Sequence, residues 1–543
     1  MNDKPIILKR PELRRHLVPI STAATQQLFT DCLIVGSGVA GLRAAIEAAN
    51  GGCEVAIVCK KTLQDSNTWN AQGGIASVLG SGDSFSSHID DTLNTGCGIC
   101  NRDTVEQVVK DGPGLVKELL EWGTEFDKSQ DGSILITLEG GHSFARVAHA
   151  LGDSTGKAIA QALIHKVRSL SNITVIENYY AIDIITNEDG VCLGIVGQNA
   201  KGTMEIIWAK TTVLATGGAG RVYRETTNPD VATADGLAMA ARAGAVLRDM
   251  EFMQFHPTTL YIAGASRALI TETLRGEGAI LRDINHDAFM SSYHKDAELA
   301  PRDVVSRAIL VQMLKTNSTH VFLDIRHFDK AFFSRRFPLI SELVASFDID
   351  ISKDLIPVRP SAHYMVGGVK TDKLARTSIK NLLACGEVAS TGLHGANRLG
   401  SNSLLEGLVF GRIAGREAIK QSGKPNGDMG LRKFRYDIPQ SDRSRLDTAD
   451  VLNSLRSLMW RNVGIIRFAK PLAEAQEIIS FWQRYVLDKV FDSATGWECQ
   501  NMLTVCLMMA KAAEARTESR GTHFRDDFPQ TNDENFKTHI EFE

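Results

Sequence analysis

The sequence predicts an α/β protein with a Rossmann-like nucleotide-binding domain, a β-meander and a C-terminal helical bundle. Three observations support this fold class. A strand, a glycine-rich turn and a helix follow one another from Asp31. Residues 180–209 alternate apolar and polar side chains around the turn sequences NEDG and NAKG, which is typical of hairpins. Beyond about residue 435, LRSLMWRNVGIIR and AEAQEIISFWQRYVLDKV repeat apolar residues at spacings of three and four, as amphipathic helices do.

The composition excludes several classes of protein. The chain has 543 residues, a net charge of −4 and 46 glycines, and a chain of this length usually forms two or three domains. Its near-neutral charge argues against nucleic-acid binding. No apolar run reaches the roughly 18 residues of a membrane span. We therefore expect neither a nucleic-acid partner nor a membrane partner.

The nine cysteines favour a reducing compartment, and we expect the protein in the cytoplasm. Several lie in apolar runs that read as buried strands, where free thiols are common. Cys97 and Cys100 form a CGIC pair without a second ligand pair nearby, so we expect free thiols and no metal site. Residues 1–30 lack the apolar core of a signal peptide and are expected to form a frayed or surface-docked extension.

The first strand–turn–helix unit carries the glycine pattern of dinucleotide-binding folds. In DCLIVGSGVAGLRAAIEAANGG, Gly36 permits the tight turn, Gly38 lets the backbone approach a pyrophosphate, and Gly41 allows close packing of helix and strand. The second strand, CEVAIVCK, ends in Cys59-Lys60 rather than in the acidic residue that binds ribose in NAD sites. Lys60 is therefore either a solvated strand end or a neighbour of the adenosine phosphates.

A second glycine turn follows a later strand. TTVLATGGAG, from Thr211, is an apolar run that leads into Gly217 and Gly218. The chain is expected to leave the parallel sheet through the β-meander and to return to it here. Taken alone, ATGG also fits an ordinary glycine turn after a strand.

Taken in order, GSGVAG, AQGGIA, the β-meander and ATGGAG resemble flavoproteins of the fumarate reductase and succinate dehydrogenase superfamily. Further matching motifs cover nearly the whole chain: TNP at 227–229, DGLAMAARAGA from Asp235, MEFMQFHPT from Met250, RGEGAIL from Arg275, ELAPRDVVSRAI from Glu298, HYMVGG from His363, ACGEVASTGLHGANRLGSNSLLEGLVFG from Ala384 and ESRGTHFRDDFP from Glu518. Within the superfamily, EGGHSFARVAHALGDSTG from Glu139, GLHGANRLGSNSLLEG from Gly392 and LMWRNVGIIR from Leu458 are similar to the L-aspartate oxidase family.

The resemblance implies FAD held without a covalent bond. Superfamily members with covalent flavin carry a histidine before AQGGI, where this chain has Ser66-Asn67-Thr68, and an amide cannot act as that nucleophile. After ACGEV, Ser401 or Asn402 is expected to cap a helix aimed at the flavin. The expected cofactor-binding residues are Gly36, Ser37, Gly38, Val39, Ala40, Gly41, Lys60, Asn67, Thr68, Ala71, Gln72, Gly73, Gly74, Ala181, Gly217, Gly218, Asp235, Glu387, Ser401, Asn402, Ser403 and Leu404.

The resemblance also implies a small dicarboxylate substrate, whose two carboxylates need several fixed donors when buried. The expected substrate-binding residues are Glu139, His256, Thr258, His363 and Arg398. Outside their motifs, the two histidines would more often be structural. Glu139 is the expected partner of an α-ammonium group, with a surface-loop carboxylate as the alternative.

Arg302 resembles the proton-transferring, catalytic arginine of the superfamily. Its alternative role is that of a helix-start residue paired with Asp303. Glu272 and Arg275 read as an i,i+3 helix pair, which we expect to support the substrate side rather than to touch the substrate.

The resemblance implies a flavin-binding domain that is split in sequence. It would comprise roughly 31–249 and 365–434, with an α+β capping domain of 250–364 inserted between its halves and a helical domain at 435–543. Substrate is expected at the junction, where cap closure would exclude water. The polar final segment, QTNDENFKTHIEFE, is expected to be a mobile or docked tail.

The activity implied by the resemblance is oxidation of L-aspartate to iminoaspartate by an FAD enzyme. The electron acceptor would be O2, giving hydrogen peroxide, or fumarate, giving succinate. This reaction is the first step of de novo NAD biosynthesis, and the imine would pass to quinolinate synthase. A soluble fumarate reductase with non-covalent FAD is the alternative enzyme, and a non-catalytic flavin-binding or assembly protein is an alternative of another class.

Overall fold

The computed structural model describes residues 4–265, 267–423, 433–439 and 441–543. The domain extents expected from the sequence also contain residues 1–3, 266, 424–432 and 440, which lie outside the described residues.

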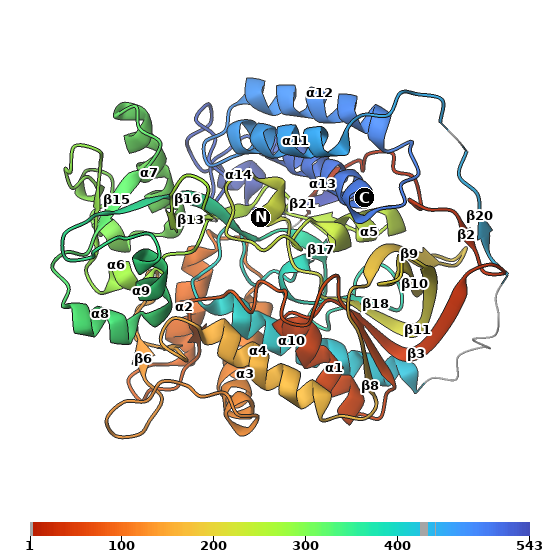
Figure 1. Ribbon diagram of the computed structural model, residues 1–543, viewed down its shortest axis with the longest axis horizontal. Coiled ribbons are helices and arrows are strands. Elements are labelled where there is room, and N and C mark those ends of the chain that lie inside the picture. The colour runs from red at the N-terminus through yellow and green to blue at the C-terminus, as the bar shows by residue number, and fades with distance from the viewer. Residues whose placement is uncertain (1–3, 266, 424–432, 440) are drawn as a thin grey trace.

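One seven-stranded mixed sheet forms the base of the nucleotide-binding fold (Figure 1). Its strands are β3 (Gln26–Val35), β4 (Val55–Val58), β8 (Ile173–Ile176), β9 (Tyr180–Thr186), β10 (Cys192–Gln198), β11 (Met204–Leu214) and β18 (Leu382–Ala384). The order is β8-β4-β3-β11-β10-β9, and β18 also pairs with β11. β9, β10 and β11 are antiparallel neighbours joined at NEDG and NAKG, so the predicted meander is confirmed.

The first strand of this sheet is longer than the apolar pattern predicts. β3 begins at Gln26 rather than at Asp31. Its first half pairs with the part of β11 that continues into the meander, from Gln26 opposite Glu205 to Thr30 opposite Ala209. This half, QQLFT, is only partly buried, and a half-exposed strand lacks the continuous apolar run that marks a buried parallel strand.

Four helices pack together beside the sheet (Figure 1): α1 (Val39–Asn50), α3 (Arg102–Glu121), α4 (Thr155–Arg168) and α10 (Asn402–Ser422). A β-carbon at Gly411 would lie 2.6 Å from the carbonyl oxygen of Ala40, and one at Gly415 would lie 2.7 Å from that of Ala44. Because side chains at a helix contact set the interaxial distance, these glycines of α10 let α1 approach closely.

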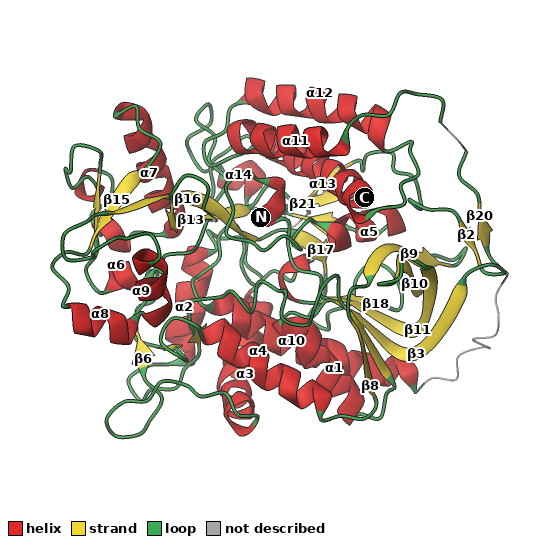
Figure 2. Ribbon diagram, in the orientation of Figure 1, coloured by secondary structure: helices red, strands yellow, loops and turns green. Residues whose placement is uncertain are grey.

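A second sheet, with the order β13-β16-β15-β14, belongs to the part of the chain between β12 (Leu247–Arg248) and β17 (Gly368–Lys370). Its strands are β13 (Met253–Leu260), β14 (Ile280–Arg282), β15 (Val321–Asp324) and β16 (Ile356–Met365). It packs with α6 (Thr273–Gly276), α7 (Arg302–Lys315), α8 (Lys330–Arg336) and α9 (Pro338–Ala345). In Figure 2 these elements lie on the left, away from the large sheet, and one buried apolar cluster within residues 260–358 forms their core.

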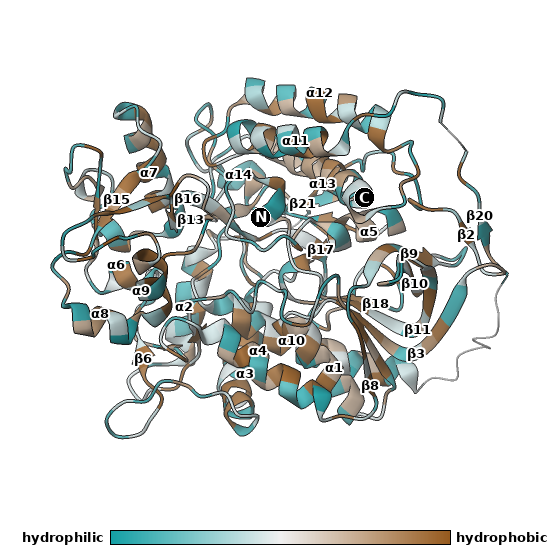
Figure 3. Ribbon diagram, viewed as in Figure 1, coloured by the Kyte–Doolittle hydropathy of each residue, from teal (hydrophilic) through white to brown (hydrophobic). Residues whose placement is uncertain are grey.

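The C-terminal part contains the predicted helices, α11 (Thr448–Asn462), α12 (Ala469–Val486) and α13 (Ala494–Ala515), which pack against one another. α13 is buried along most of its length. α12 lies at the edge of the molecule and carries both hydrophilic and hydrophobic residues (Figure 3). None of the helices in the described residues has the length and hydropathy that a membrane crossing needs.

Both ends of the chain enter one sheet, whose order is β1-β21-β12-β17-β19. The strands not yet given are β1 (Ile6–Leu8), β19 (Ala389–Ser390) and β21 (Ile540–Phe542). The final segment is therefore docked: after α14 (Asp533–Phe536), β21 lies between β1 and β12 with all its residues buried. The remaining elements are β2 (Ile20–Ser21), β5 (Ile75–Ala76), α2 (Phe85–Thr95), β6 (Ile136–Thr137), β7 (Val147–Ala148), α5 (Asp235–Ala243) and β20 (Arg435–Tyr436).

Candidate active site

A cavity of about 950 Å³ opens at the carboxyl ends of β3 and β4, where ligands bind in open α/β sheets. Its lining joins the glycine turn, the segment before AQGGI, the meander and the start of α10. The expected cofactor residues that line it are Gly36, Ser37, Gly38, Val39, Ala40, Lys60, Asn67, Thr68, Ala71, Gln72, Ala181, Gly217, Asp235, Glu387, Ser403 and Leu404.

The glycine turn before α1 has the geometry of a phosphate cradle. Gly36 has φ +115°, and a β-carbon there would lie 2.2 Å from the carbonyl oxygen of Ala215, so no other residue fits. A β-carbon at Gly38 would meet only the Thr68 hydroxyl, at 3.5 Å, among the described atoms. The backbone at Gly38 is therefore open to the cavity, and the N-terminus of α1 begins there, which suits an anionic diphosphate.

In one part of the cavity wall, Asp235 lies beside Lys60, the residue that ends the CEVAIVCK run. Lys60 Nζ lies 2.9 Å from Asp235 Oδ2, and the Tyr180 hydroxyl donates to Asp235 Oδ1 at 2.8 Å. Burial alone would raise the pKa of the Asp235 carboxyl, but neighbouring Lys60 holds that pKa below its usual value. The result is an ionised carboxylate on α5 in the wall of the cavity, whose oxygens also accept from Asn501 and Thr233. Lys60 is thus not a solvated strand end.

In another part of the cavity wall, polar groups converge on Glu387. Asn67 Nδ2 donates to Glu387 Oε2 at 2.8 Å, and the backbone N–H of Met365 donates to Oε1 at 2.9 Å. Burial raises the pKa of the Glu387 carboxyl to about 7. Gln72 lines the cavity, and its buried Oε1 has no hydrogen-bond partner among the described residues. An orphaned buried acceptor fits a ligand that donates, and the whole donor set fits FAD.

Six expected cofactor residues lie behind the wall rather than on it: Gly41, Gly73, Gly74, Gly218, Ser401 and Asn402. Gly41, Gly74 and Gly218 allow close packing, because β-carbons there would come within 2.2–2.4 Å of other protein atoms. Ser401 occupies the N-cap position of α10 with φ +61° but makes no capping hydrogen bond within the described part of the chain. Its hydroxyl instead donates to Glu139 Oε2 at 2.7 Å. The expected helix start and the N-cap position at Ser401 are confirmed, but the expected capping bond from its side chain is wrong.

Beside the cavity, charged groups from segments far apart in the sequence meet around Gly400. A β-carbon at Gly400 would lie 3.3 Å from a terminal nitrogen of Arg302 and 3.4 Å from Glu139 Oε2. Arg302 and Arg398 both donate to Gln254 Oε1, each at 3.2 Å. Glu272 Oε2 would lie 3.7 Å from the same β-carbon. Arg302 therefore lies between two carboxylates near Gly400 and shares Gln254 with Arg398, and each of these side chains is buried or nearly so.

Two histidines complete this cluster. The rings of His256 and His363 lie edge to face with their centroids 5.3 Å apart, and His363 also lines the cavity. Burial, followed by the charge of Arg302, lowers the pKa of His256 well below its usual value, and burial with His256 does the same for His363. Both rings are therefore neutral hydrogen-bonding groups. Thr258 does not turn its hydroxyl to the cluster but donates it to the carbonyl oxygen of Ile270, at 2.9 Å.

Arg302 begins α7 but does not pair with Asp303. Its Nε donates to Glu272 Oε2 at 2.6 Å, while Asp303 pairs with Arg307. Glu272 also pairs with Arg275 at 3.0 Å, which confirms the expected i,i+3 pair. Burial would raise the pKa of Glu272, but Arg302 and Arg275 lower it to about 2. Three charged side chains therefore form a continuous row that ends at Arg302.

Arg398 is held by neutral partners. Its guanidinium lies 4.5 Å above the Tyr364 ring and donates to the Ser403 hydroxyl at 2.8 Å. Burial, followed by repulsion from Arg302, lowers the pKa of Arg398 to about 10. No carboxylate within the described ranges forms an ion pair with Arg398, so its charge is available to an anionic ligand.

The sequence did not predict three contacts of the candidate site. These are the contacts of Gln254 with Arg302 and Arg398, of Ser401 with Glu139, and of Tyr364 with Arg398. A signal existed for Gln254: it lies two residues before His256 in a strand, and such residues share one face. The nine cysteines are all free. The described residues contain no group of His, Cys, Asp or Glu side chains suited to a metal ion.

Known proteins match the chain over nearly its whole length. The family described as FAD binding domain matches residues 31–404, and the one described as fumarate reductase flavoprotein C-term matches residues 452–542. An L-aspartate oxidase of Streptomyces coelicolor is 40% identical, covering 94% of this chain and 91% of its own. One of Acinetobacter baylyi is 42% identical, covering 94% and 95%. The chain belongs to the L-aspartate oxidase family.

Solved structures support the same superfamily. A mutated FrdA chain of E. coli quinol fumarate reductase superposes with a TM-score of 0.88 at 35% identity, covering 95% of this chain and 94% of that chain. The fold expected from the sequence is confirmed by this likeness. As a member of the L-aspartate oxidase family with a matched FAD binding domain, the chain is a flavin oxidoreductase and its cofactor is FAD.

Proposed function

We propose that this enzyme oxidises L-aspartate to iminoaspartate in the cluster around Gly400. The observation that carries the proposal is the position of Arg302, which lies beside Glu139 at Gly400 and shares the Gln254 side chain with Arg398. L-aspartate has two carboxylates and one ammonium group. Two guanidiniums and one carboxylate are the complementary set, and charge-assisted pairs of this kind are the strong ones.

Arg398 is proposed to bind a substrate carboxylate, because its planar fork suits bidentate recognition and its protein partners are neutral. His256 and His363 add uncharged polar contacts and so do not repel the guanidiniums nearby. Glu139 is proposed to accept from the α-ammonium group. Its oxygens now accept from Ser401 and Thr273, and these hydroxyls would keep the carboxylate in place when substrate binds.

The bound FAD supplies the acceptor for the hydride that leaves the α-carbon. The non-covalent link is supported by Asn67, whose side chain is engaged with Glu387 and offers no imidazole. We propose that Arg302 moves the proton at the substrate. Glu272 accepts from Arg302, and Arg275 pairs with Glu272 and reaches the backbone of partly exposed Glu298. This row would return each proton between Arg302 and the solvent.

Several wider features belong to the same proposal. The reduced enzyme would pass its electrons to O2, giving hydrogen peroxide, or to fumarate, giving succinate. The imine would be consumed by quinolinate synthase in de novo NAD biosynthesis. Nine free cysteines support action in the cytoplasm. We also propose the division into a flavin domain of 31–249 and 365–434, a cap of 250–364 and a helical domain of 435–543.

An anaerobic titration tests the function. Adding L-aspartate to the yellow enzyme without oxygen should bleach the oxidised-flavin absorbance, and fumarate should restore it. If L-aspartate fails to bleach the flavin while fumarate reoxidises the dithionite-reduced enzyme, the protein is a fumarate reductase. If neither compound changes the absorbance, it is a non-catalytic flavin-binding protein.

A further inference from the structure

The C-terminal segment from Arg516 to Glu543 contacts the chain where it crosses from β12 into β13. This crossover, residues 249–252, leads directly to the strand that carries Gln254 and His256. Its first residue, Asp249, has φ +61°, an uncommon conformation for a residue with a side chain. His539 Nδ1 lies 2.6 Å from Asp249 Oδ2, and the backbone N–H of Asp249 donates to the carbonyl oxygen of Ile540 at 2.8 Å.

The return crossover touches the same point. A β-carbon at Gly367, between β16 and β17, would lie 2.0 Å from the carbonyl oxygen of Asp249. The backbone N–H of Val366 donates to the carbonyl oxygen of Phe252 at 3.0 Å. Both connections to the β13–β16 sheet therefore pass through one small region, and the C-terminal strand lies against it.

A fully buried ion pair between Arg516 and Glu251 holds the crossover. Arg516 Nε donates to Glu251 Oε1 at 2.6 Å, and both side chains are completely inaccessible to solvent. The Arg516 guanidinium also lies 4.9 Å from the Phe252 ring. Its terminal nitrogens donate to Glu518 and to the carbonyl oxygens of Phe536 and Thr538, each at 2.9 Å. Arg516 thus ties the crossover to three places in the C-terminal segment.

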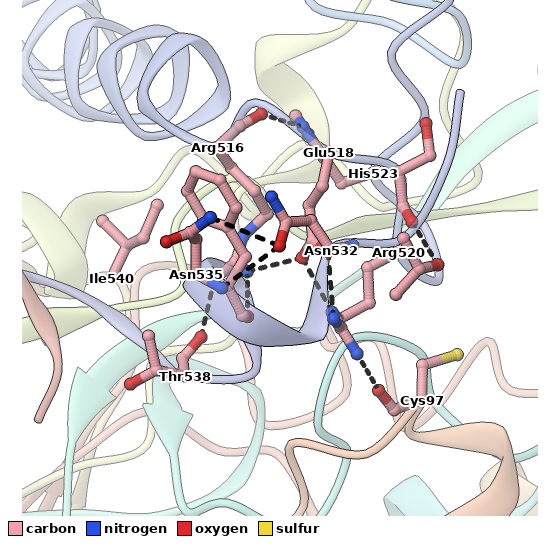
Figure 4. A network of polar contacts seen from close by, with 12 residues as sticks. Cys97, Arg516, Glu518, Arg520, His523, Asn532, Asn535, Thr538 and Ile540 are labelled. Atoms are coloured by element: carbon pink, nitrogen blue, oxygen red, sulfur yellow. Dashed lines mark hydrogen bonds and ion pairs between the residues drawn. The ribbon is translucent and has the colours of Figure 1, made fainter. Parts of the chain in front are cut away.

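The same network reaches the loop before Arg398. Figure 4 shows Arg516, Glu518 and Arg520 pointing toward one another, with Arg520 extending to the carbonyl oxygen of Cys97. Two residues beyond Arg520, the backbone N–H and the hydroxyl of Thr522 both donate to the carbonyl oxygen of Ala396, at 3.0 and 3.2 Å. Ala396 precedes Asn397 and Arg398, and Gln254 Nε2 donates to both of those residues.

We propose that residues 516–543 form a brace that sets the position of Gln254 and His256 relative to Arg398, with Glu251 and Arg516 as positioning residues. One side of the brace holds the crossover into β13, and the other holds the loop of Arg398. The substrate-binding groups of the two sides then meet at the spacing that a four-carbon dicarboxylate requires. The proposal rests on the substrate site proposed above. It assigns the buried charges of the C-terminal segment a role in positioning the substrate site in addition to a role in stability.

Arg516→Lys tests the brace, with Arg525→Lys as its matched control. Lysine keeps the charge but cannot bond Glu251, Glu518 and two carbonyl oxygens at once. Arg525 is as deeply buried in the same segment. Its side chain bonds Asp527 and the end of α13, and within the described part of the chain it makes no hydrogen bond to either crossover or to Ala396. Both variants should lose thermal stability. Only Arg516→Lys should lose kcat/KM, by about 10²-fold for a misplaced site, with KM for L-aspartate and for fumarate rising together.

Two further readouts on the FAD-loaded protein separate positioning from general damage. Without substrate, amide hydrogen exchange of β13 should quicken in Arg516→Lys and not in Arg525→Lys. The dissociation constant for FAD should change by less than about twofold in either variant, because the brace residues do not line the cavity. If Arg516→Lys fails to fold, Glu251→Gln, which keeps the shape and removes the charge, is measured in its place.

The outcomes decide the proposal in either direction. Selective loss of kcat/KM with faster exchange in β13 supports the brace. Equal effects of the two arginine substitutions, or an Arg516 variant with normal KM and normal exchange, overturn it. A wild-type enzyme that fails to turn over L-aspartate and fumarate refutes the proposed function instead, and the exchange experiment still decides whether the brace holds β13.

Discussion

Glu139→Gln should slow L-aspartate oxidation far more than fumarate reduction. Glu139 is 4% exposed and accepts from Ser401 at 2.7 Å and from Thr273 at 3.2 Å. Glutamine keeps an acceptor oxygen of the same shape, so the loop keeps its place. The substitution removes the negative charge that we assign to the α-ammonium group of the substrate. It also turns one of the two acceptor oxygens into an NH2 donor, from which a rotated hydroxyl can accept.

The size of the effect follows from the bond that is lost. A hydrogen bond to a charged group contributes about 1.5–3 kcal/mol, and each 1.4 kcal/mol is roughly tenfold. We expect kcat/KM for L-aspartate to fall by about 10-fold to 10²-fold. Fumarate has no ammonium group, so its reduction should change by less than about threefold, within the scatter of an independent site.

Two assays on the same preparation measure the ratio: hydrogen peroxide formed from L-aspartate and oxygen, and oxidation of a reduced dye by fumarate. Glu417→Gln is the control, because Glu417 is an equally buried carboxylate on α10 that pairs with Arg376 away from the site. It should leave the ratio of the two activities unchanged. Equal losses of both activities in Glu139→Gln would refute the assignment of Glu139 to the ammonium group.

Three further predictions concern other parts of the site. Arg398→Lys should raise KM for both L-aspartate and fumarate by about 10²-fold, since a buried charge pair is worth roughly 2–5 kcal/mol. Steady-state kinetics with each substrate checks this, and a rise in KM for only one of the two substrates would contradict it. Gly38→Ala should fold but bind FAD at least about tenfold more weakly in a fluorescence titration, because its β-carbon projects toward the cavity, where the backbone must approach the pyrophosphate. Gly36→Ala should fail to fold, because its β-carbon would collide with Ala215. Burial raises the pKa of Glu387 to about 7, so the folded apoprotein holds a proton that the unfolded chain has already lost. Its unfolding free energy should therefore fall by up to about 3 kcal/mol as pH rises from roughly 4.5 to 7. Urea unfolding should show a smaller fall over this pH range in Glu387→Gln than in the wild type, and an equal fall would contradict the buried acid.

Local patterns predicted the parts of the fold that repeat local rules. The glycine turn before α1 and the meander follow from spacing and turn residues, and both are in the structure. Asp235 was expected at the cofactor through a motif, but its ion pair with Lys60 is visible only when α5 is placed beside the end of β4.

Contacts between distant segments could not be predicted from spacing. Asp303 is the nearest carboxylate to Arg302 in sequence, yet it pairs one helical turn away with Arg307. Arg302 instead pairs with Glu272, which lies at the start of α6. In the same way, HIEFE reads as a polar tail until β1 and β12, from far earlier in the chain, supply the neighbours that bury it.

We propose that the net charge of the cluster helps to distinguish L-aspartate from fumarate. Arg275, Arg302 and Arg398 carry three positive charges, and Glu139 and Glu272 carry two negative ones, with His256 and His363 neutral. The remaining positive charge balances L-aspartate, whose two carboxylates and one ammonium leave one negative charge. Fumarate carries two negative charges and leaves one uncompensated in a buried site, which is costly. Removing the charge of Glu139 would balance fumarate instead, so Glu139→Gln should keep or lower KM for fumarate while it raises KM for L-aspartate. On this proposal, the Glu139 carboxylate makes fumarate bind somewhat less well than L-aspartate, in addition to holding the amino acid.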